Sequence, residues 1–452
     1  MSLAVATPGG VVPSRRGKLP SRCRGRGTGD VATHVLLPDA KCWGPFPRRS
    51  ARHRRRPVAA GSSAPLVSDE PRLDLVVFTV IVDDLVFPDG TTSMGVLGGG
   101  GPQTAFGFRT HFGNFSVGIA AGVGPDFPEQ CADWLDTNGV DTEGLALVLD
   151  ADTTESEESA STEKEKGGVA LVLDTDKQEK EKKGVSWEGG GASASSFRRR
   201  GETLDDDDSK RYLPTPRAWQ ITEHDGARTQ VWRTRPSPGL YAMLRPPFST
   251  LPAKYKNAKA FHVGVHPERP DLDLLLALRN SRGGEILISV EPFTSALNPV
   301  SNELLTQLCS VCDVFSPNEL EAVSLVGSGN PVELCERLAA FGAKIVCLRR
   351  GELGAVVLDT RISPNETWSV PAYLRDSETS DVTGCGNAFC GAFLASLLHG
   401  EGVAAAACWG SAAASVMAEN AGVPTVPAGD AQTRNEVQKR CEALLVKTKR
   451  IK

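Results

Sequence analysis

A short glycine-containing run follows a threonine in the C-terminal part of the chain. Gly384, Cys385 and Gly386 lie between Thr383 and Asn387, and an alanine-rich apolar run begins directly after them. Glycine allows backbone N–H groups to approach a ligand closely, and the first turn of a helix carries partial positive charge. This combination suits an anion such as phosphate. The sequence therefore predicts an anion-binding turn at a helix start, with Asn387 within reach of a reacting group.

Two groups of residues in the N-terminal half could contribute to the same chemistry. The apolar run at residues 73–82 is predicted to be a central strand, and Asp83 and Asp84 follow it. Carboxylates at the carboxyl end of a strand can meet a ligand in an α/β sheet, although a solvated turn explains them equally well. The glycine run 98–101 precedes Gln103 and a helical pattern, which suggests close approach of the backbone to a ligand.

Two further groups lie in the C-terminal half. Asn318 and Glu321 are three positions apart at the start of a predicted helix, and Gly351 and Gly354 occupy a turn between two predicted strands. A carboxylate oxygen is a suitable ligand for Mg²⁺ or for its water shell. Taken singly, an asparagine N-cap, a surface carboxylate and a plain turn are simpler explanations. The order of all these groups along the chain favours a shared site.

The intervening segments alternate between apolar β-branched runs and helical patterns. Strands are expected at 115–121, 258–265, 285–290, 311–316, 344–348 and 355–358, and helices at 129–138, 271–282, 302–309, 331–341, 386–399 and 403–420. Two short strands are expected within 216–233, and Asp225-Gly226 between them predicts a hairpin turn. Strands that alternate with helices of this length predict an α/β fold whose mostly parallel sheet is flanked by helices.

The overall composition shows no charge bias. The chain has 452 residues with 50 basic and 55 acidic side chains and a net charge of −5, so we expect no nucleic-acid partner. No stretch of about 18 or more purely apolar residues occurs, so we expect no membrane span. The 11 cysteines are irregularly spaced, which indicates reduced thiols. Cys309 and Cys312 are interpreted as part of a helix end rather than as a metal or redox pair.

Composition divides the chain into segments. Residues 1–70 are rich in arginine and poor in acidic residues, which predicts a transit peptide and a plastid or mitochondrial location; the alternatives are a disordered basic tail or a misassigned start, with a cytoplasmic location. Residues 71–449 are expected to form one domain. The acidic, low-complexity stretch 150–211 is predicted to be a disordered insertion within it. The sequence ALVLD occurs at 146–150 and again at 170–174, and one copy is expected to be a strand.

The order of these motifs, from about 73 to 426, resembles that of the ribokinase (PfkB) family of small-molecule kinases. The resemblance implies a ribokinase-like α/β fold with a small β lid, formed by the segments around 86–96 and 217–233. It also implies ATP and Mg²⁺ as cofactors and a sugar or nucleoside as substrate. A homodimer formed through the lid is compatible with it.

The resemblance also implies a role for each motif. The catalytic anion hole would comprise Gly384, Cys385, Gly386 and Asn387; the substrate would be bound by Asp83 (or Asp84), Gly99, Gly100 and Gln103; and the nucleotide would be bound by Asn318, Glu321, Gly351, Gly354 and Thr383, with Glu321 also serving the metal.

Asn387 stands where the family has an aspartate that takes the proton from the substrate hydroxyl. An amide is not a base, so water, a substrate carboxylate, Asp381 or Asp83 would have to accept that proton. A eukaryotic branch of the family is similar in carrying Gly-Asn here and Glu-Pro at 291–292. Two hypotheses follow: a phosphotransferase, or a pseudokinase that binds nucleotide or sugar as a regulator or scaffold.

Overall fold

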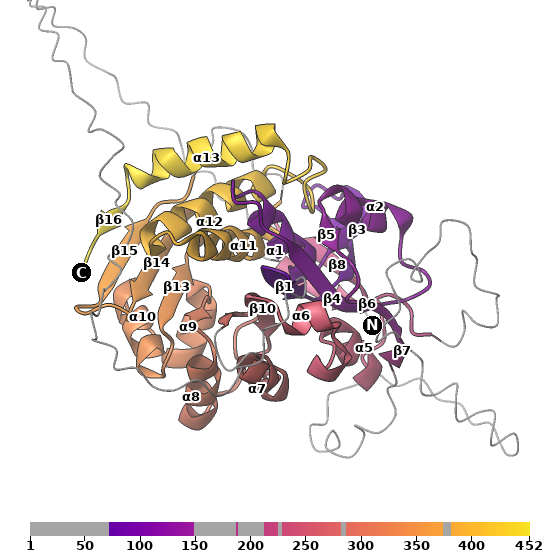
Figure 1. Ribbon diagram of the computed structural model, residues 1–452, viewed down its shortest axis with the longest axis horizontal. Helices are drawn as coiled ribbons and strands as arrows, with labels where there is room; N and C mark the ends of the chain where they lie inside the picture. The colour runs from indigo at the N-terminus through magenta and orange to yellow at the C-terminus, as the bar shows by residue number, and fades with distance from the viewer. Residues whose placement is uncertain (1–71, 149–186, 189–211, 225–227, 282–285, 374–380) are drawn as a thin grey trace, which may run out of the picture. The chain divides into compact units, whose positions relative to one another are not determined.

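The computed structural model describes residues 72–148, 187–188, 212–224, 228–281, 286–373 and 381–452 (Figure 1). The predicted transit peptide, nearly all of the predicted acidic insertion and the second ALVLD copy lie outside these residues. The first copy forms strand β6 (Leu145–Val148). In the described part of the chain, no helix is both long enough and apolar enough to cross a membrane.

The main sheet has 12 strands, in the order β16-β15-β14-β13-β12-β11-β10-β1-β4-β6-β7, and β5 pairs with β4. Its parallel strands are β1 (Leu75–Phe78), β4 (Val117–Val123), β5 (Val140–Asp141), β6, β10 (Ala260–Val265), β11 (Leu287–Pro292), β12 (Val314–Phe315) and β13 (Ile345–Arg349). The antiparallel strands β14 (Ala355–Asp359), β15 (Glu366–Val370), β16 (Lys449–Arg450) and β7 (Trp187–Glu188) extend the two ends. The predicted mostly parallel sheet is therefore confirmed.

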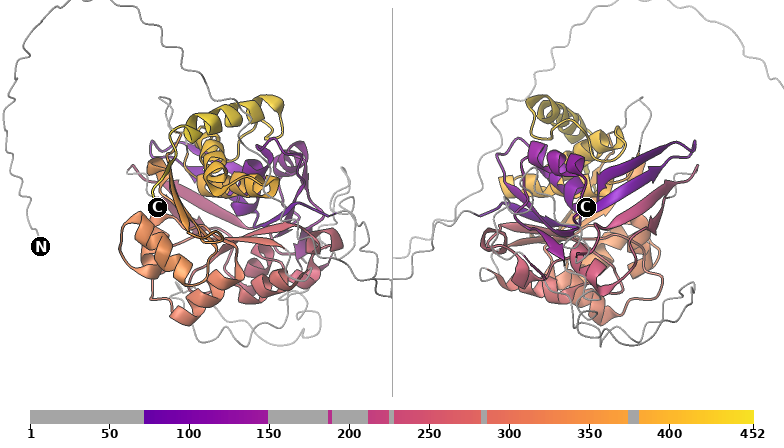
Figure 2. Two further views of the ribbon diagram at one scale, coloured as in Figure 1. Left: turned by 60° about the vertical axis from the view of Figure 1, so that its left-hand side comes forward. Right: turned by 90° about the vertical axis from the view of Figure 1, so that its right-hand side faces the viewer.

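Helices cover both faces of this sheet (Figures 1 and 2). One layer contains α1 (Gly100–Arg109), α2 (Glu129–Thr137), α11 (Cys385–His399), α12 (Val403–Ala418) and α13 (Ala431–Leu445). The other contains α6 (Ala253–Lys256), α7 (Leu272–Asn280), α8 (Asn302–Val311), α9 (Glu319–Val326) and α10 (Pro331–Ala340). Leu75 and Val77 pack into the first layer, whereas Val76 and Phe78 pack into the second. A buried strand with two apolar faces explains the continuous apolar run in the sequence.

A separate four-stranded sheet forms the lid. Its order is β3-β2-β8-β9, with β2 (Ile81–Val86), β3 (Thr92–Gly98), β8 (Arg217–Thr222) and β9 (Arg228–Trp232). Figure 2 shows these strands projecting away from the main sheet. Helix α5 (Pro238–Leu244) packs its Leu240 and Leu244 against Ile81 and Ala218 of the lid. The small β sheet expected from the segments around 86–96 and 217–233 is therefore present.

The prediction of one continuous strand at 73–82 is wrong. The chain leaves the main sheet after Phe78, adopts a positive φ of 77° at Thr79 and enters the lid at Ile81. The Thr79 hydroxyl donates to the carbonyl oxygen of Leu244 at 3.0 Å, which helps to hold a backbone conformation unfavourable for a β-branched residue. Asp83 and Asp84 consequently lie within a lid strand, not at the end of a central strand.

Three smaller differences concern the C-terminal half. Strand β15 and helix α13 were not foreseen, because a short edge strand and a mainly polar helix give weak apolar patterns. The sequence also predicts Pro317 in the first turn of the helix that follows it, but α9 begins at Glu319 and Pro317 precedes the Asn318 N-cap. Cys309 and Cys312 are fully buried at the end of α8, where the Cys312 thiol lies 3.4 Å from the Cys309 carbonyl oxygen.

Candidate functional site

Helix α11 begins at the turn that the sequence predicted to bind an anion. Gly384 has a φ of 81° and is the N-cap, and no side chain caps the first N–H groups. The Asp381 carboxylate accepts hydrogen bonds from the Thr383 N–H at 2.8 Å and the Gly422 N–H at 3.4 Å, which holds the turn in place. The Cys385 N–H donates to the Val382 carbonyl at 3.3 Å. The predicted anion-binding capacity of the turn would therefore rest mainly on the N–H groups that follow Cys385.

The start of α1 lies against the start of α11. Asn387 Nδ2 donates to Gln103 Oε1 at 2.8 Å, and Gln103 is 4% exposed. A Cβ added to Gly384 would lie 2.4 Å from Gln103 Cδ, and one added to Gly100 would lie 3.1 Å from Asn387 Oδ1. The structure thus brings together four predicted site residues from the two halves of the chain.

Gly99 and Asp83 adjoin this contact from the lid side. Gly99 is the N-cap of α1 and has a φ of 85°. The buried Asp83 carboxylate accepts a hydrogen bond from Gln220 Nε2 at 2.9 Å. A Cβ on Gly98 would lie only 1.8 Å from Asp83 Oδ2, so this carboxylate rests directly on the glycine run. Of the two aspartates, Asp83 is the one that faces the predicted substrate-binding glycines.

Asp84 instead connects strands of the lid. Its carboxylate accepts hydrogen bonds from Arg217 Nε and Nη2, each at 2.8 Å, from Arg233 Nη1 and from the Gly95 N–H at 3.0 Å. Burial of Asp84 opposes its ionisation, but the hydrogen bonds from the two arginines lower the pKa of this carboxyl to about 2. These contacts give Asp84 a structural role in the lid.

Asn318 and Glu321 form a capping box at the start of α9. Glu321 N–H donates to Asn318 Oδ1 at 2.8 Å, while Glu321 Oε2 and Oε1 accept from Asn318 N–H at 2.7 Å and Nδ2 at 2.6 Å. The asparagine N-cap expected as the simpler explanation is present, but Glu321 is buried rather than a surface carboxylate. Each carboxylate oxygen has a second lone pair, so the pair could still orient water around a cation.

The turn at Gly351 and Gly354 lies beside this cap. A parallel β-bridge joins Arg349 to Asn318, and Arg350 Nε donates to Glu319 Oε2 at 3.0 Å. The short 3-10 helix η5 (Gly351–Leu353) and Gly354 with its φ of 83° complete the turn. The predicted nucleotide-binding residues of α9 and of this turn are therefore neighbours.

Comparison with known proteins relates part of the chain to one family. Residues 245–428 match the family model of the pfkB family carbohydrate kinases. The match includes the α9 cap, the Gly351 turn and the start of α11.

The chain is also similar to individual proteins. It is 32% identical over 151 residues to a cytidine kinase of Thermococcus kodakarensis, which covers 33% of this chain and 52% of that protein. The chain therefore spans about half the length of the curated relatives it matches.

Among solved structures, the fold is similar to Arabidopsis thaliana ribokinase complexed with ribose and ATP, with a TM-score of 0.51 and 17% identity over 82% of this chain and 99% of that chain. It is also similar to a Methanocaldococcus jannaschii nucleoside kinase, with a TM-score of 0.50 and 15% identity over 83% of this chain and all of that chain. At these identities the likeness shows the fold, which is ribokinase-like.

Arg349 is a residue near the predicted site motifs that the sequence motifs did not indicate. Its Nη2 donates to the Ser316 carbonyl at 2.8 Å and lies 3.3 Å from Glu291 Oε2 and 3.6 Å from Glu321 Oε2. A Cβ on Gly386 would lie 1.8 Å from Arg349 Nη1. A charged residue at the end of the apolar run 345–348 was the available signal, because that position is at the carboxyl edge of the sheet.

The surroundings of Arg349 keep the ion pairs charged. Burial of Glu291 opposes its ionisation, but Arg349 and the neighbouring His262 hold the pKa of this carboxyl below its ordinary value. Burial likewise acts to lower the pKa of Arg349, yet Glu291 and Glu321 keep it raised. Because Arg349 already balances Glu291, the buried group of His262, Glu291 and Cys390 is poorly suited to a metal ion.

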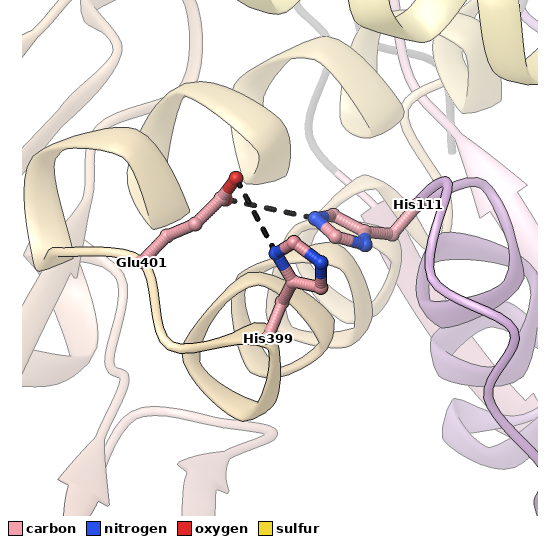
Figure 3. Close-up of side chains that lie close together, drawn as sticks. All are labelled: His111, His399 and Glu401. Carbon is pink, nitrogen blue, oxygen red and sulfur yellow. Dashed lines mark ion pairs between the residues drawn. The ribbon is translucent and has the colours of Figure 1, made fainter. Parts of the chain in front are cut away.

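A second group of possible metal ligands lies at the far end of α11 (Figure 3). His111 Nε2 is 3.6 Å from Glu401 Oε2, and His399 Nδ1 is 3.8 Å from Glu401 Oε1. His111 Nδ1 accepts a hydrogen bond from the Gly113 N–H at 3.1 Å, so the ring proton sits on Nε2 and points to the carboxylate. A protonated Nε2 cannot bind a metal, and this cluster is interpreted as a structural contact.

Proposed function

We propose that the protein is an ATP- and Mg²⁺-dependent phosphotransferase that transfers a phosphoryl group to a hydroxyl of a small carbohydrate or nucleoside. The observation that carries this proposal is the contact between the uncapped start of α11 and the glycine-rich start of α1, made through Asn387 and Gln103. One helix start provides oriented N–H groups for a phosphate, and the other belongs to the segment that adjoins Asp83.

Phosphoryl transfer depends mainly on positioning and on charge neutralisation, which this arrangement can supply. The N–H groups of Gly386 and Asn387 would hold the transferred phosphate, and Asp83 would orient a substrate hydroxyl. Glu321 and Asn318 would hold Mg²⁺ through its water molecules. When bound, Mg²⁺ neutralises charge on the phosphates of ATP. The residues present therefore fit the cofactors that the family implies.

Asn387 can position a substrate hydroxyl but cannot take its proton. Its Nδ2 is engaged by Gln103, so its Oδ1 is the atom left to accept a hydrogen bond. A positioned base contributes about 10²–10⁴ to a rate, and we expect a correspondingly slow enzyme. The same observation favours the second candidate function, a pseudokinase that binds nucleotide or sugar as a regulator or scaffold.

ATP turnover by the full-length chain tests the choice between these functions. The acceptor panel should include cytidine and ribose, because one relative is a cytidine kinase and one structural neighbour was solved with ribose. We expect slow product formation by the wild type and faster formation by Asn387→Asp. Asn365→Asp, at an exposed position, is the control for the added charge and should match the wild type. Product from Asn387→Asp but none from the wild type would favour the pseudokinase.

We further propose a homodimer formed through the lid. Met94 of β3 and Val231 of β9 are 47% and 46% exposed, and each lies on an outer strand of the lid. Light scattering after gel filtration should give twice the chain mass for the wild type and the chain mass for Val231→Asp. A wild-type monomer would contradict this proposal.

A further inference from the structure

Arg349 presents two different sides to its surroundings. One side is fixed: the hydrogen bond to Ser316 and the nearest contacts to Glu291 and Glu321 all involve Nη2. Nε is buried and has no hydrogen-bond partner among the described residues. The guanidinium is therefore held in a single orientation by the carboxyl edge of the sheet, before any ligand binds.

The other side of Arg349 is directed toward the anion-binding turn. Nη1 lies so close to Gly386 that a Cβ there would be 1.8 Å from it. In a helix the Cβ position points toward the N-terminus, so Nη1 lies beside the half-buried first turn of α11. An anion that accepts from the Gly386 N–H would lie within reach of Nη1.

A cation at this position is unfavourable for the helix itself. The N-terminus of α11 carries partial positive charge, and a guanidinium beside it adds like charge in a buried setting. Glu291 and Glu321 balance the charge of Arg349 on its Nη2 side, whereas Nη1 is the nitrogen beside Gly386. The positive end of α11 and the guanidinium of Arg349 adjoin the same position. An anion bound at that position best explains why both are there.

We propose that Arg349 contacts the transferred phosphoryl group through Nη1 and acts as a fixed cation at the phosphate end of the site. This inference rests on the proposed function, because it assigns a further residue to the same site. Arginine suits the role better than lysine, since its planar group can donate from Nη2 to the sheet edge and from Nη1 to the phosphate at once.

Calorimetric titration of the full-length chain with ATP and with adenosine tests the role of Arg349. The ratio of the dissociation constants for ATP and adenosine isolates the contribution of the phosphates to binding. Each titration should be made once with Mg²⁺ and once with EDTA. Arg349→Lys keeps a charge that can pair with Glu291, but its single nitrogen cannot donate to the sheet edge and to the phosphate at once. We expect it to weaken ATP binding by about tenfold to a hundredfold and to leave adenosine binding unchanged.

Two further variants control for folding. Arg440→Lys alters another buried arginine, which pairs with Glu419 and Glu436 outside the site, and it should leave the ATP-to-adenosine ratio unchanged. The double variant Arg349→Met with Glu291→Gln removes a buried ion pair as a unit, so it should fold even if Arg349→Lys does not. Its dissociation constant for ATP should rise by the same factor as that of Arg349→Lys.

The outcomes separate this inference from the proposed function. If the wild type prefers ATP to adenosine and the folded Arg349 variants keep that preference, the role of Arg349 is overturned while the proposed function stands. If the wild type itself binds ATP no more tightly than adenosine, the start of α11 does not hold phosphate, and both proposals are overturned.

Discussion

The amide pair of Asn387 and Gln103 determines which atoms face the reacting groups. Because Nδ2 of Asn387 donates to Gln103, the carbonyl oxygen Oδ1 is turned toward the start of α1. That oxygen can accept a hydrogen bond from a hydroxyl but remains a very weak base. In the proposed function, Gln103 would thus be a positioning residue whose effect on catalysis acts through Asn387.

Replacing Gln103 with leucine should expose that role. Gln103→Leu has a similar volume but gives Asn387 Nδ2 no acceptor, so the Asn387 amide would no longer be held in one orientation. We expect kcat to fall about tenfold while the dissociation constant for ATP stays the same. Gln432→Leu, at an exposed position of α13, is the matched control. A loss of ATP affinity instead would mean that Gln103 supports the nucleotide.

The close approach of Arg349 to Gly386 leaves no room for a larger side chain at position 386. In Gly386→Ala the new methyl group would overlap Arg349 Nη1, and moving that side chain would disturb its ion pairs with Glu291 and Glu321. Overpacking of this kind costs about 1–3 kcal/mol of the free energy of unfolding. Urea denaturation of Gly386→Ala and of the wild type measures this loss in the free energy of unfolding.

Gly402→Ala is the control for Gly386→Ala. A Cβ on Gly402 meets nothing within 4 Å, and its φ of −75° suits any residue. Its free energy of unfolding should change by less than about 1 kcal/mol. Equal destabilisation by the two substitutions would show that the contact with Arg349 does not explain the glycine.

At the scale of elements, the lid depends on a break in the first apolar run and on one carboxylate. Thr79 turns the chain from β1 into β2, and Asp84 on β2 ties Arg217 of β8 and Arg233 to that strand. Because β2 and β8 come from distant parts of the sequence, Asp84 fixes the geometry of the lid that carries Asp83.

The stability of the lid should depend on pH in acid. The pKa of Asp84 is lowered to about 2 in the folded protein from an unfolded value of about 3.9. A lowered folded pKa contributes stability that is fully present above about pH 4 and is lost as the pH falls through about 2. The protection of residues 81–98 against hydrogen exchange, relative to the intrinsic exchange rate at each pH, should therefore fall over this range. In Asp84→Asn the exchange should be faster at neutral pH and lack this additional acid dependence.

The sequence predicted the central elements better than the lid and the edges. Apolar segments such as α11 and the strand β10 were predicted correctly, because elements that are buried almost throughout give continuous apolar runs. The run 73–82 was assigned to one strand because two buried strands in different sheets have the same composition. Local patterns cannot show a single positive φ at Thr79.

At the scale of the whole molecule, the site is assembled from both halves of the chain. The family match covers residues 245–428, whereas Asp83 and Gln103 precede it. The sequence motifs indicated these residues, and the structure brings Gln103 to Asn387. The position of Arg349 after a strand was only a weak signal in the sequence, since a single arginine there has many explanations until its proximity to Gly386 is seen.

The same assembly predicts how ligands stabilise the protein. ATP bound at the start of α11 and at the α9 cap would contact elements of the main sheet, so it should raise the melting temperature of the full-length chain. At about 100 times the dissociation constant, the expected gain in the free energy of unfolding is about 2.7 kcal/mol. Differential scanning calorimetry measures this gain. A melting temperature that does not change with ATP concentration would contradict nucleotide binding by the folded chain.

The most direct measurement follows the terminal phosphate of ATP itself. ATP labelled with ¹⁸O in its γ-phosphate is incubated with the full-length wild-type chain, Mg²⁺ and cytidine or ribose, and the products are analysed by mass spectrometry. We predict that the label appears in a phosphorylated acceptor, and that Gly386→Ala yields much less of this product. Label found only in ATP or in inorganic phosphate across the acceptor panel would contradict phosphoryl transfer by this site.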